Sequence, residues 1–163
     1  MYDMIISAGM QPTLTTVYTY GDTIYVPHGS LNLEDHLIEH EQTHSVQQSL
    51  YKDPSNLMEG PDAWWSRYVD DAYFRIDQES EAYGHQFTFI CKRVKDRNMR
   101  NRVLLDLARF LASPIYGSVI TQDTARRMIL NKSNVPYRDW ETDRKSTRLN
   151  SSHSAKSRMP SSA

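Results

Sequence analysis

The chain contains neither glycine nor proline between Leu33 and Tyr51, and this 19-residue run is the feature that most restricts its fold. Both residue types are unfavourable inside helices, glycine by about 1 kcal/mol and proline by about 3 kcal/mol relative to alanine. Asn32 precedes the run as a candidate N-cap. Glu34 and Asp35 then occupy the first turn, where the helix dipole favours carboxylates. The pattern predicts one long helix over this run.

This helix carries the sequence HEQTH at residues 40–44, which fits the pattern H-E-x-x-H. Because residues four apart share one helix face, the imidazoles of His40 and His44 can reach a single ion. Glu41 lies beside His40 around the helix and can address a water on that ion, whose pKa zinc lowers to about 7. The spacing therefore predicts His40 and His44 as metal ligands and Glu41 as the general base. The alternative is a chance match in which the histidines, with His36, form a surface stripe.

A catalytic zinc ion requires a third protein ligand besides the two histidines. Two candidates, Glu79 and Glu81, follow on a later predicted helix, after a loop and a helix that can reverse the chain. Either can instead be an exposed helical carboxylate, which is what most glutamates are. The residues alone leave this choice open.

With these residues in place, the sequence resembles the gluzincin metallopeptidases, in which H-E-x-x-H on one helix is completed by a glutamate on a later helix. In several of these families an alanine follows that glutamate by three residues, and matching Ala82 to it implies that Glu79 is the ligand. The family's aspartate, four residues after the ligand, would fall at Tyr83, so the partner that orients a metal-bound histidine must come from elsewhere. The resemblance spans about residues 15–90. HEQTHSVQQ in particular is similar to the helix of small bacterial and phage-encoded predicted peptidases.

The resemblance implies a zinc-dependent metallopeptidase that hydrolyses peptide bonds in a peptide or protein substrate. It also suggests that the strand near residues 23–26 pairs with an extended peptide by edge-strand addition. A first alternative is a zinc-binding structural or phage-associated interaction protein without peptidase turnover. Glu41 favours the enzyme, because a structural site has no use for a carboxylate that does not bind metal. A second alternative is a helical interaction domain in which HEQTH is accidental. Neither the substrate sequence nor an oligomeric state follows from these motifs.

The rest of the chain predicts a small β element followed by helices. Residues 15–26 are β-branched and aromatic on both sides of Gly21-Asp22, the signature of a short hairpin. Two prolines and a glycine predict a loop over 52–62. Helices are expected at 63–75, 76–95 and 99–112, and from Thr121, which is a candidate N-cap. We therefore expect an α+β fold, mostly α, with an N-terminal hairpin, a zincin-like active-site helix and a helical bundle.

Two further sets of side chains are candidates for the site. The aromatic residues that could line a substrate cleft are Trp64, Trp65, Tyr68, Tyr73 and Phe74, although aromatics at helical spacing are more often core residues. The candidates for stabilising an oxyanion are Arg67, Tyr68, Arg75, Tyr83 and His85, and the sequence does not rank them. Cys91 lies among apolar residues spaced along one face of the predicted helix over 76–95, so we expect it to pack rather than to act as a nucleophile.

The last residues, 143–163, differ from the rest of the chain. They contain seven serines and no apolar periodicity, and they match the translation of a sequencing-library adapter. We expect this tail to be an artefact that packs against nothing, with a single domain over residues 1–142 whose natural C-terminus is missing. The tail holds five of the 19 basic and one of the 20 acidic residues, which leaves 14 and 19 and a net charge of −5. That charge argues against a nucleic-acid-binding surface.

Three further observations bear on the compartment. No apolar run approaches the length needed to span a bilayer. The single cysteine rules out an intrachain disulfide, so nothing requires an oxidising compartment. The N-terminus lacks the basic segment of a secretory signal. We expect a cytoplasmic protein with no membrane partner, acting in the host cell if it is phage-encoded.

Overall fold

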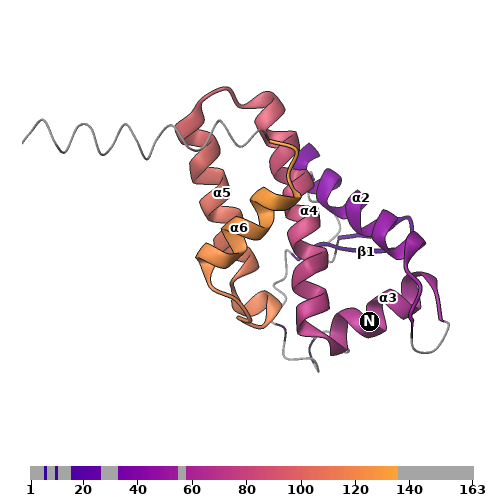
Figure 1. Ribbon diagram of the computed structural model, residues 1–163. Helices are drawn as coiled ribbons and strands as arrows, with labels where there is room; N and C mark the ends of the chain where they lie inside the picture. The colour runs from indigo at the N-terminus through magenta and orange to yellow at the C-terminus, as the bar shows by residue number, and fades with distance from the viewer. Residues whose placement is uncertain (1–5, 7–9, 11–15, 27–32, 55–57, 136–163) are drawn as a thin grey trace, which may run out of the picture.

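The computed structural model describes residues 6, 10, 16–26, 33–54 and 58–135. Helix α4 (Ala72–Arg93) lies in the middle of the fold. On one side of it are α2 (Asp35–Leu50) and α3 (Gly60–Asp70), and on the other are α5 (Arg97–Leu111) and α6 (Gln122–Lys132) (Figure 1). A 3-10 turn, η1 (Pro114–Tyr116), lies between the last two helices. The predicted class, α+β and mostly α, is confirmed, and the predicted artefact tail lies outside the described residues.

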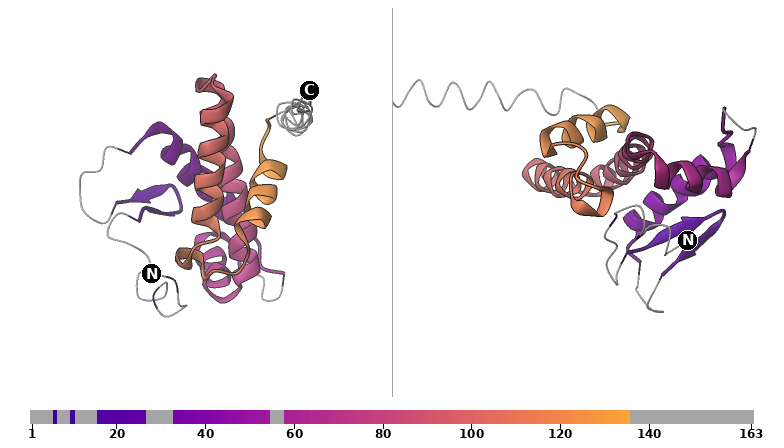
Figure 2. Two further views of the ribbon diagram at one scale, coloured as in Figure 1. Left: turned by 90° about the vertical axis from the view of Figure 1, so that its left-hand side faces the viewer. Right: turned by 90° about the horizontal axis from the view of Figure 1, so that it is seen from below.

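The predicted hairpin is present as β1 (Tyr18–Tyr20) and β2 (Thr23–Tyr25), an antiparallel pair with Thr19 opposite Ile24. Gly21 in the turn has a φ of 61°, which glycine adopts readily because it has no Cβ. Thr19 is 1% exposed, and strand β1 packs against α2. Figure 2 shows the hairpin beside α2 and far from α5 and α6. The hairpin is therefore fixed against the helix that carries HEQTH.

Helix α2 begins two residues later than predicted. Its N-cap is Glu34, which has an extended backbone and makes no capping hydrogen bond through its side chain. The Glu34 carboxylate instead lies 2.6 Å from Nε2 of His36, in the first turn of the helix. Asn32, the predicted N-cap, lies outside the described residues.

The second and third predicted helices meet at Asp71, and not between residues 75 and 76 as predicted. The Asp71 carboxylate accepts hydrogen bonds from the backbone N–H groups of Tyr73 and Phe74, both at 3.0 Å. An aspartate that satisfies these free donors is a strong N-cap, so α4 begins at Ala72. Asp96 and Thr121 cap α5 and α6 in the same way, the second as predicted.

One apolar core lies between α4, α5 and α6. Its fully buried members include Ile76, Phe87, Leu104, Leu111 and Ile129. Cys91 packs against this cluster, in agreement with the prediction. Gly84 lets α6 approach α4 closely, because a Cβ at this position would lie 2.8 Å from Cβ of Lys132 and 2.9 Å from its carbonyl carbon.

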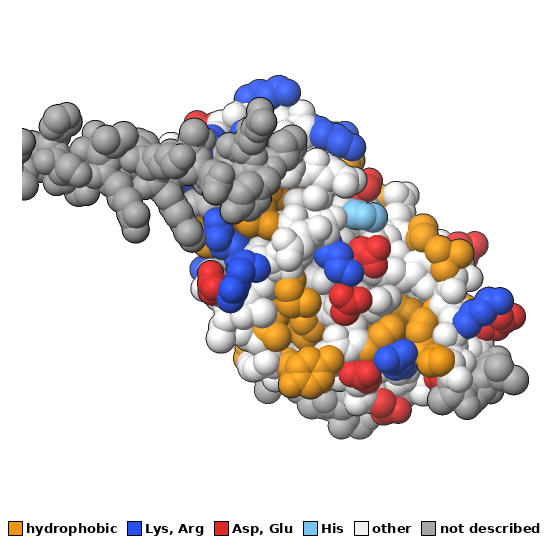
Figure 3. Space-filling view, viewed as in Figure 1, with side chains coloured by type: hydrophobic (Ala, Val, Ile, Leu, Met, Phe, Trp, Pro, Cys, Tyr) orange, Lys and Arg blue, Asp and Glu red, His pale blue; other side chains and the backbone are white. Residues whose placement is uncertain are grey.

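A second core lies between α3 and the hairpin. It contains Trp64, Trp65 and Tyr68, all less than 9% exposed, so these three aromatics are core residues. Tyr73, by contrast, is 76% exposed. Apolar side chains also appear among interspersed basic and acidic ones on the face in Figure 3. No described helix is long and apolar enough to cross a membrane.

Candidate metal centre

The centre forms where α2 and α4 pack against each other between the two cores. The two helices run antiparallel, since contacts join His36 to Gln86 at one end and Gln47 to Gln78 near the other. This arrangement places Glu79 opposite the two histidines of HEQTH. His40 and His44 are each 6% exposed and Glu79 is 3% exposed, so all three side chains are buried.

The ligand atoms of these three residues converge. Nε2 of His40 and Nε2 of His44 are 3.2 Å apart. Each lies 3.3 Å from a different carboxylate oxygen of Glu79. A tetrahedral ion with bonds of about 2.0 Å requires ligand atoms roughly 3.3 Å apart. Among the described residues this is the group of three whose ligand atoms could hold one metal ion.

An unpartnered atom supports the same fit. Oε2 of Glu79 is buried and has no hydrogen-bond partner among the described residues. Leaving a buried carboxylate oxygen without a partner is costly, because burial removes its water. A cation between this oxygen and the two imidazole nitrogens would satisfy it. The donor set of two nitrogens and one oxygen is one that zinc accepts.

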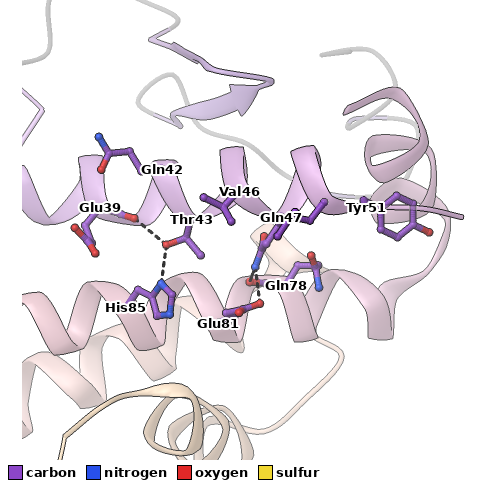
Figure 4. A pocket seen from close by; sticks show the side chains of 10 residues that line it. Glu39, Gln42, Thr43, Val46, Gln47, Tyr51, Gln78, Glu81 and His85 are labelled. Carbon is purple, nitrogen blue, oxygen red and sulfur yellow. Dashed lines mark hydrogen bonds between the residues drawn. The ribbon is translucent and has the colours of Figure 1, made fainter. Parts of the chain in front are cut away.

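The positions of Glu79 and Glu81 differ in the structure, although the residues alone did not decide which of them is the candidate third ligand. Glu79 faces the imidazoles, whereas Oε2 of Glu81 accepts a hydrogen bond from Nε2 of Gln47 at 3.0 Å. Glu81 lies on the other side of the helix pair, in a groove of about 500 Å³ between α2 and α4 (Figure 4). His85 lies in the same groove, where its Nδ1 is 3.1 Å from Oγ1 of Thr43. The geometry therefore places Glu79 at the centre and Glu81 and His85 outside it.

The charges at the centre are strongly coupled. Burial alone would lower the pKa of His44, but the attraction and hydrogen bonding of the Glu79 carboxylate outweigh it and raise the pKa to about 9. Burial would raise the pKa of Glu79, but the charge of His44 and the imidazole nitrogens 3.3 Å from its carboxylate oxygens hold that pKa well below its usual range. Without a metal ion, the site therefore holds an imidazolium–carboxylate pair at neutral pH.

Three tyrosines surround Glu79 and His40. Tyr68 donates a hydrogen bond of 2.6 Å to Oε1 of Glu79, and burial and the Glu79 charge raise the pKa of its phenol well above the usual value. Tyr83 packs edge-on against the His40 ring, with centroids 4.5 Å apart, and its hydroxyl lies 3.0 Å from that of Tyr116. Burial raises the pKa of both these phenols as well. All three remain protonated donors at neutral pH.

Two of the five oxyanion candidates thus contact a ligand residue, namely Tyr68 and Tyr83. Arg75 is buried and binds main-chain carbonyls, with Nη1 2.6 Å from the oxygen of Tyr68 and Nε 3.4 Å from that of Tyr116. Arg67 is partly exposed, pairs with Asp71 and stacks on Phe74. Both arginines therefore have structural partners.

Glu41 is held by the hairpin. Its Oε2 accepts a hydrogen bond of 2.8 Å from Oγ1 of Thr19 on β1, and Glu41 is 6% exposed. The backbone oxygen of Thr19 accepts hydrogen bonds from the side chains of Gln48 and Trp65, which lock the strand in place. Thr19 was not a sequence candidate. Its position in a predicted strand that precedes the HEQTH helix was the one available signal.

Two glutamines complete the surroundings of the histidines, and sequence reasoning missed both. Nδ1 of His44 lies 2.8 Å from Oε1 of Gln47, and Nδ1 of His40 lies 3.1 Å from Oε1 of Gln86. The signal for Gln86 was its position seven residues after Glu79, two helical turns along the same face.

No known family model, curated protein or solved structure matches this chain.

Proposed function

We propose that the protein is a zinc-dependent metallopeptidase in which His40, His44 and Glu79 hold the metal and Glu41 is the general base. The observation that carries the proposal is the convergence of Nε2 of both histidines with the Glu79 carboxylate, at 3.2–3.3 Å. Glu41 follows His40 directly but does not belong to the group of converging ligand atoms. A carboxylate that lies beside a metal group without joining it is what a base requires.

Zinc bound there would supply a Lewis acid that activates a water molecule for attack on a peptide carbonyl. Glu41 would accept a proton from the attacking water as the C–O bond forms. It would deliver that proton to the leaving nitrogen as the C–N bond breaks, so no other co-reactant would be needed. Thr19 holds the Glu41 carboxylate through one oxygen, which leaves the other available for the proton. Tyr68 and Tyr83 are the donors nearest to the ligands and therefore the candidates for stabilising the oxyanion.

The proposed substrate is a peptide or protein segment. Strand β2 pairs with β1 along one edge, and among the described residues no strand pairs with its other edge. An extended peptide that adds to this edge would bind through main-chain hydrogen bonds. We place the enzyme in the cytoplasm, or in the host cell if it is phage-encoded, because the single cysteine makes no demand on an oxidising compartment.

One observation favours a second candidate, a zinc site kept for structure or partner binding without turnover. His40, Glu41, His44 and Glu79 are all at most 6% exposed, and this burial restricts the access of a substrate to the site. The two functions differ in what they require of Glu41, since a structural site does not depend on that carboxylate.

The test measures zinc content and casein hydrolysis on the same preparations. Glu41→Gln keeps the size and hydrogen bonding of the side chain but removes the base, so zinc should stay at one ion per chain while hydrolysis falls at least ~100-fold. His44→Ala removes a ligand and should lose both. Glu39→Gln changes a glutamate of the same helix that faces the groove, and should lose neither. Equal hydrolysis by wild type and Glu41→Gln would overturn the mechanism, and zinc without hydrolysis in wild type would favour the structural site.

A further inference from the structure

The two candidate ligand histidines each contact a glutamine at the nitrogen that faces away from the centre. His44 contacts Gln47, and His40 contacts Gln86, in both cases through Nδ1 and Oε1. Among the hydrogen bonds of the described residues, neither glutamine is paired with Glu79. Metal-bound histidines commonly donate the hydrogen of their second nitrogen to a carboxylate, a carbonyl or water. Here a neutral side-chain amide occupies that position for both rings.

The orientation of the Gln47 amide is fixed by its other contacts. Its Nε2 lies 3.0 Å from the backbone oxygen of Gln78 and 3.0 Å from Oε2 of Glu81. Both partners are acceptors, so the nitrogen of the amide must face them and the oxygen must face His44. Figure 4 shows Gln47 reaching from α2 to these two residues on α4. Nδ1 of His44 therefore carries the hydrogen in this contact.

A second chain of contacts fixes the Gln86 amide. Nε2 of His36 lies 2.6 Å from the Glu34 carboxylate, so that nitrogen is the donor. Nδ1 of His36 lies 2.9 Å from Nε2 of Gln86, and because an amide nitrogen can only donate, Nδ1 of His36 is the acceptor. The Gln86 oxygen then faces Nδ1 of His40, which must donate. Gln86 is 2% exposed, so water does not compete for this position.

These contacts determine what faces the centre. With the hydrogen held on Nδ1, the Nε2 of a neutral His40 presents a lone pair towards Glu79 and has no hydrogen to donate. The glutamines thus select the tautomer that a metal ion requires.

We infer that Gln47 and Gln86 are the positioning residues of the metal centre, which fix the ring orientation and the Nδ1–H tautomer of His44 and His40. The inference rests on the metal site of the proposed function, but not on peptidase activity. It also accounts for Tyr83 at the position where a carboxylate partner was expected, because Gln86, three residues further along α4, serves His40 instead. Since both partners are neutral, they orient the ligands without adding negative charge around the ion.

The test compares Gln47→Met and Gln86→Met with a matched control. Methionine keeps the length of the side chain and removes its polar group. Gln48→Met is the control, since Gln48 is a fully buried glutamine beside Gln47 on α2. Among the described residues its amide bonds to the hairpin alone, at Gly21 and Thr19. Zinc affinity is measured by competition with a chelator of known affinity. We expect each of the two positioning variants to bind zinc about 10- to 100-fold more weakly, as for other residues of this kind. The control should lower the unfolding midpoint but leave zinc affinity within about twofold.

Two further measurements separate positioning from a general loss of structure. Gln86→Glu keeps an acceptor at Nδ1, so it should restore zinc affinity to the wild-type value or above. The second measurement uses ¹⁵N chemical shifts of the neutral His40 ring in metal-free protein. These shifts should report the Nδ1–H tautomer in wild type and in Gln48→Met. In Gln86→Met they should change towards those of the Nε2–H tautomer.

Zinc affinities of Gln47→Met and Gln86→Met within twofold of wild type, or an equal loss in Gln48→Met, would overturn the inference. An unchanged His40 tautomer in Gln86→Met would overturn it as well, even if the wild type binds no zinc. Absent hydrolysis with the expected loss of affinity would remove the peptidase and leave the positioning role. Hydrolysis by the wild type, with unchanged zinc affinity in the two positioning variants, would remove the positioning role and leave the peptidase.

Discussion

Zinc binding at neutral pH should displace one proton from His44, and lowering the pH should weaken binding. In the metal-free centre the Glu79 carboxylate raises the pKa of His44 to about 9, and a zinc ligand must be the neutral imidazole. At pH 7 the ring lies about two pH units below that pKa. The apparent zinc affinity should therefore be roughly 100-fold weaker than at pH 9 and above, a cost of about 3 kcal/mol. Glu79, whose pKa is lowered, is already ionised and releases no proton.

The assay is a chelator competition at intervals between pH 7 and 10, corrected for the titration of the chelator. The logarithm of the zinc affinity should rise by close to one per pH unit and level off near pH 9. Calorimetry at pH 7 in buffers of different ionisation enthalpy should detect the release of about one proton per zinc ion.

The same shift has a consequence for the metal-free protein. The pKa of His44 in the folded protein lies above its unfolded value of about 6.5, so protonated His44 stabilises the fold. This stabilisation is fully present below pH 6.5 and is lost as the pH rises towards 9. The loss should amount to about 3 kcal/mol of unfolding free energy. In Glu79→Gln burial still lowers the pKa of His44 while only Glu41 and Gln47 raise it, so this pKa should fall clearly below 9. A zinc affinity that does not change between pH 7 and 9, or a His44 pKa that is the same in Glu79→Gln, would refute this reasoning.

Two other predictions concern contacts on either side of the centre. Thr19→Val removes the hydroxyl that donates to Glu41 and leaves a buried carboxylate without its partner, which should cost about 1–3 kcal/mol of unfolding free energy in urea titrations. Thr19→Ser keeps the hydroxyl and should cost less, so equal losses would contradict the role of the hydrogen bond. Gly84→Ala should lower the thermal unfolding midpoint, because overpacking against Lys132 costs about 1–3 kcal/mol and exceeds the ~1 kcal/mol that alanine contributes to a helix. A raised midpoint would show that α6 can move away freely.

The HEQTH helix and the fold class could be predicted because they depend on local patterns. A run without glycine or proline indicates a helix wherever it packs, and residues four apart then share a face. The choice of Glu79 over Glu81 could not be derived from the residues, because both lie on one helix and only its packing against α2 decides which of them faces the histidines. The resemblance to gluzincins implied Glu79, and the structure places its carboxylate beside both imidazoles.

The supporting residues were missed for a related reason. Gln86 lies 46 residues from His40, and its spacing of seven residues from Glu79 indicates a shared helix face but not a contact with His40. Its role follows from tertiary packing alone. The boundary at Asp71 is a different case, because the capping aspartate was visible in the sequence. Apolar periodicity continues across it, however, and concealed the break.

The Arg75 guanidinium has a consequence for any attempt to shorten this protein. The three candidate ligands and Glu41 all belong to α2 and α4, so a chain that ended after α4 would retain every one of them. Arg75, however, connects the carbonyl of Tyr68, whose hydroxyl bonds to Glu79, to the carbonyl of Tyr116, which lies beyond α5. A truncated chain would leave this buried cation with one of its acceptors removed and the phenol of Tyr83 without its neighbour. A minimal version of the centre must therefore extend at least as far as η1.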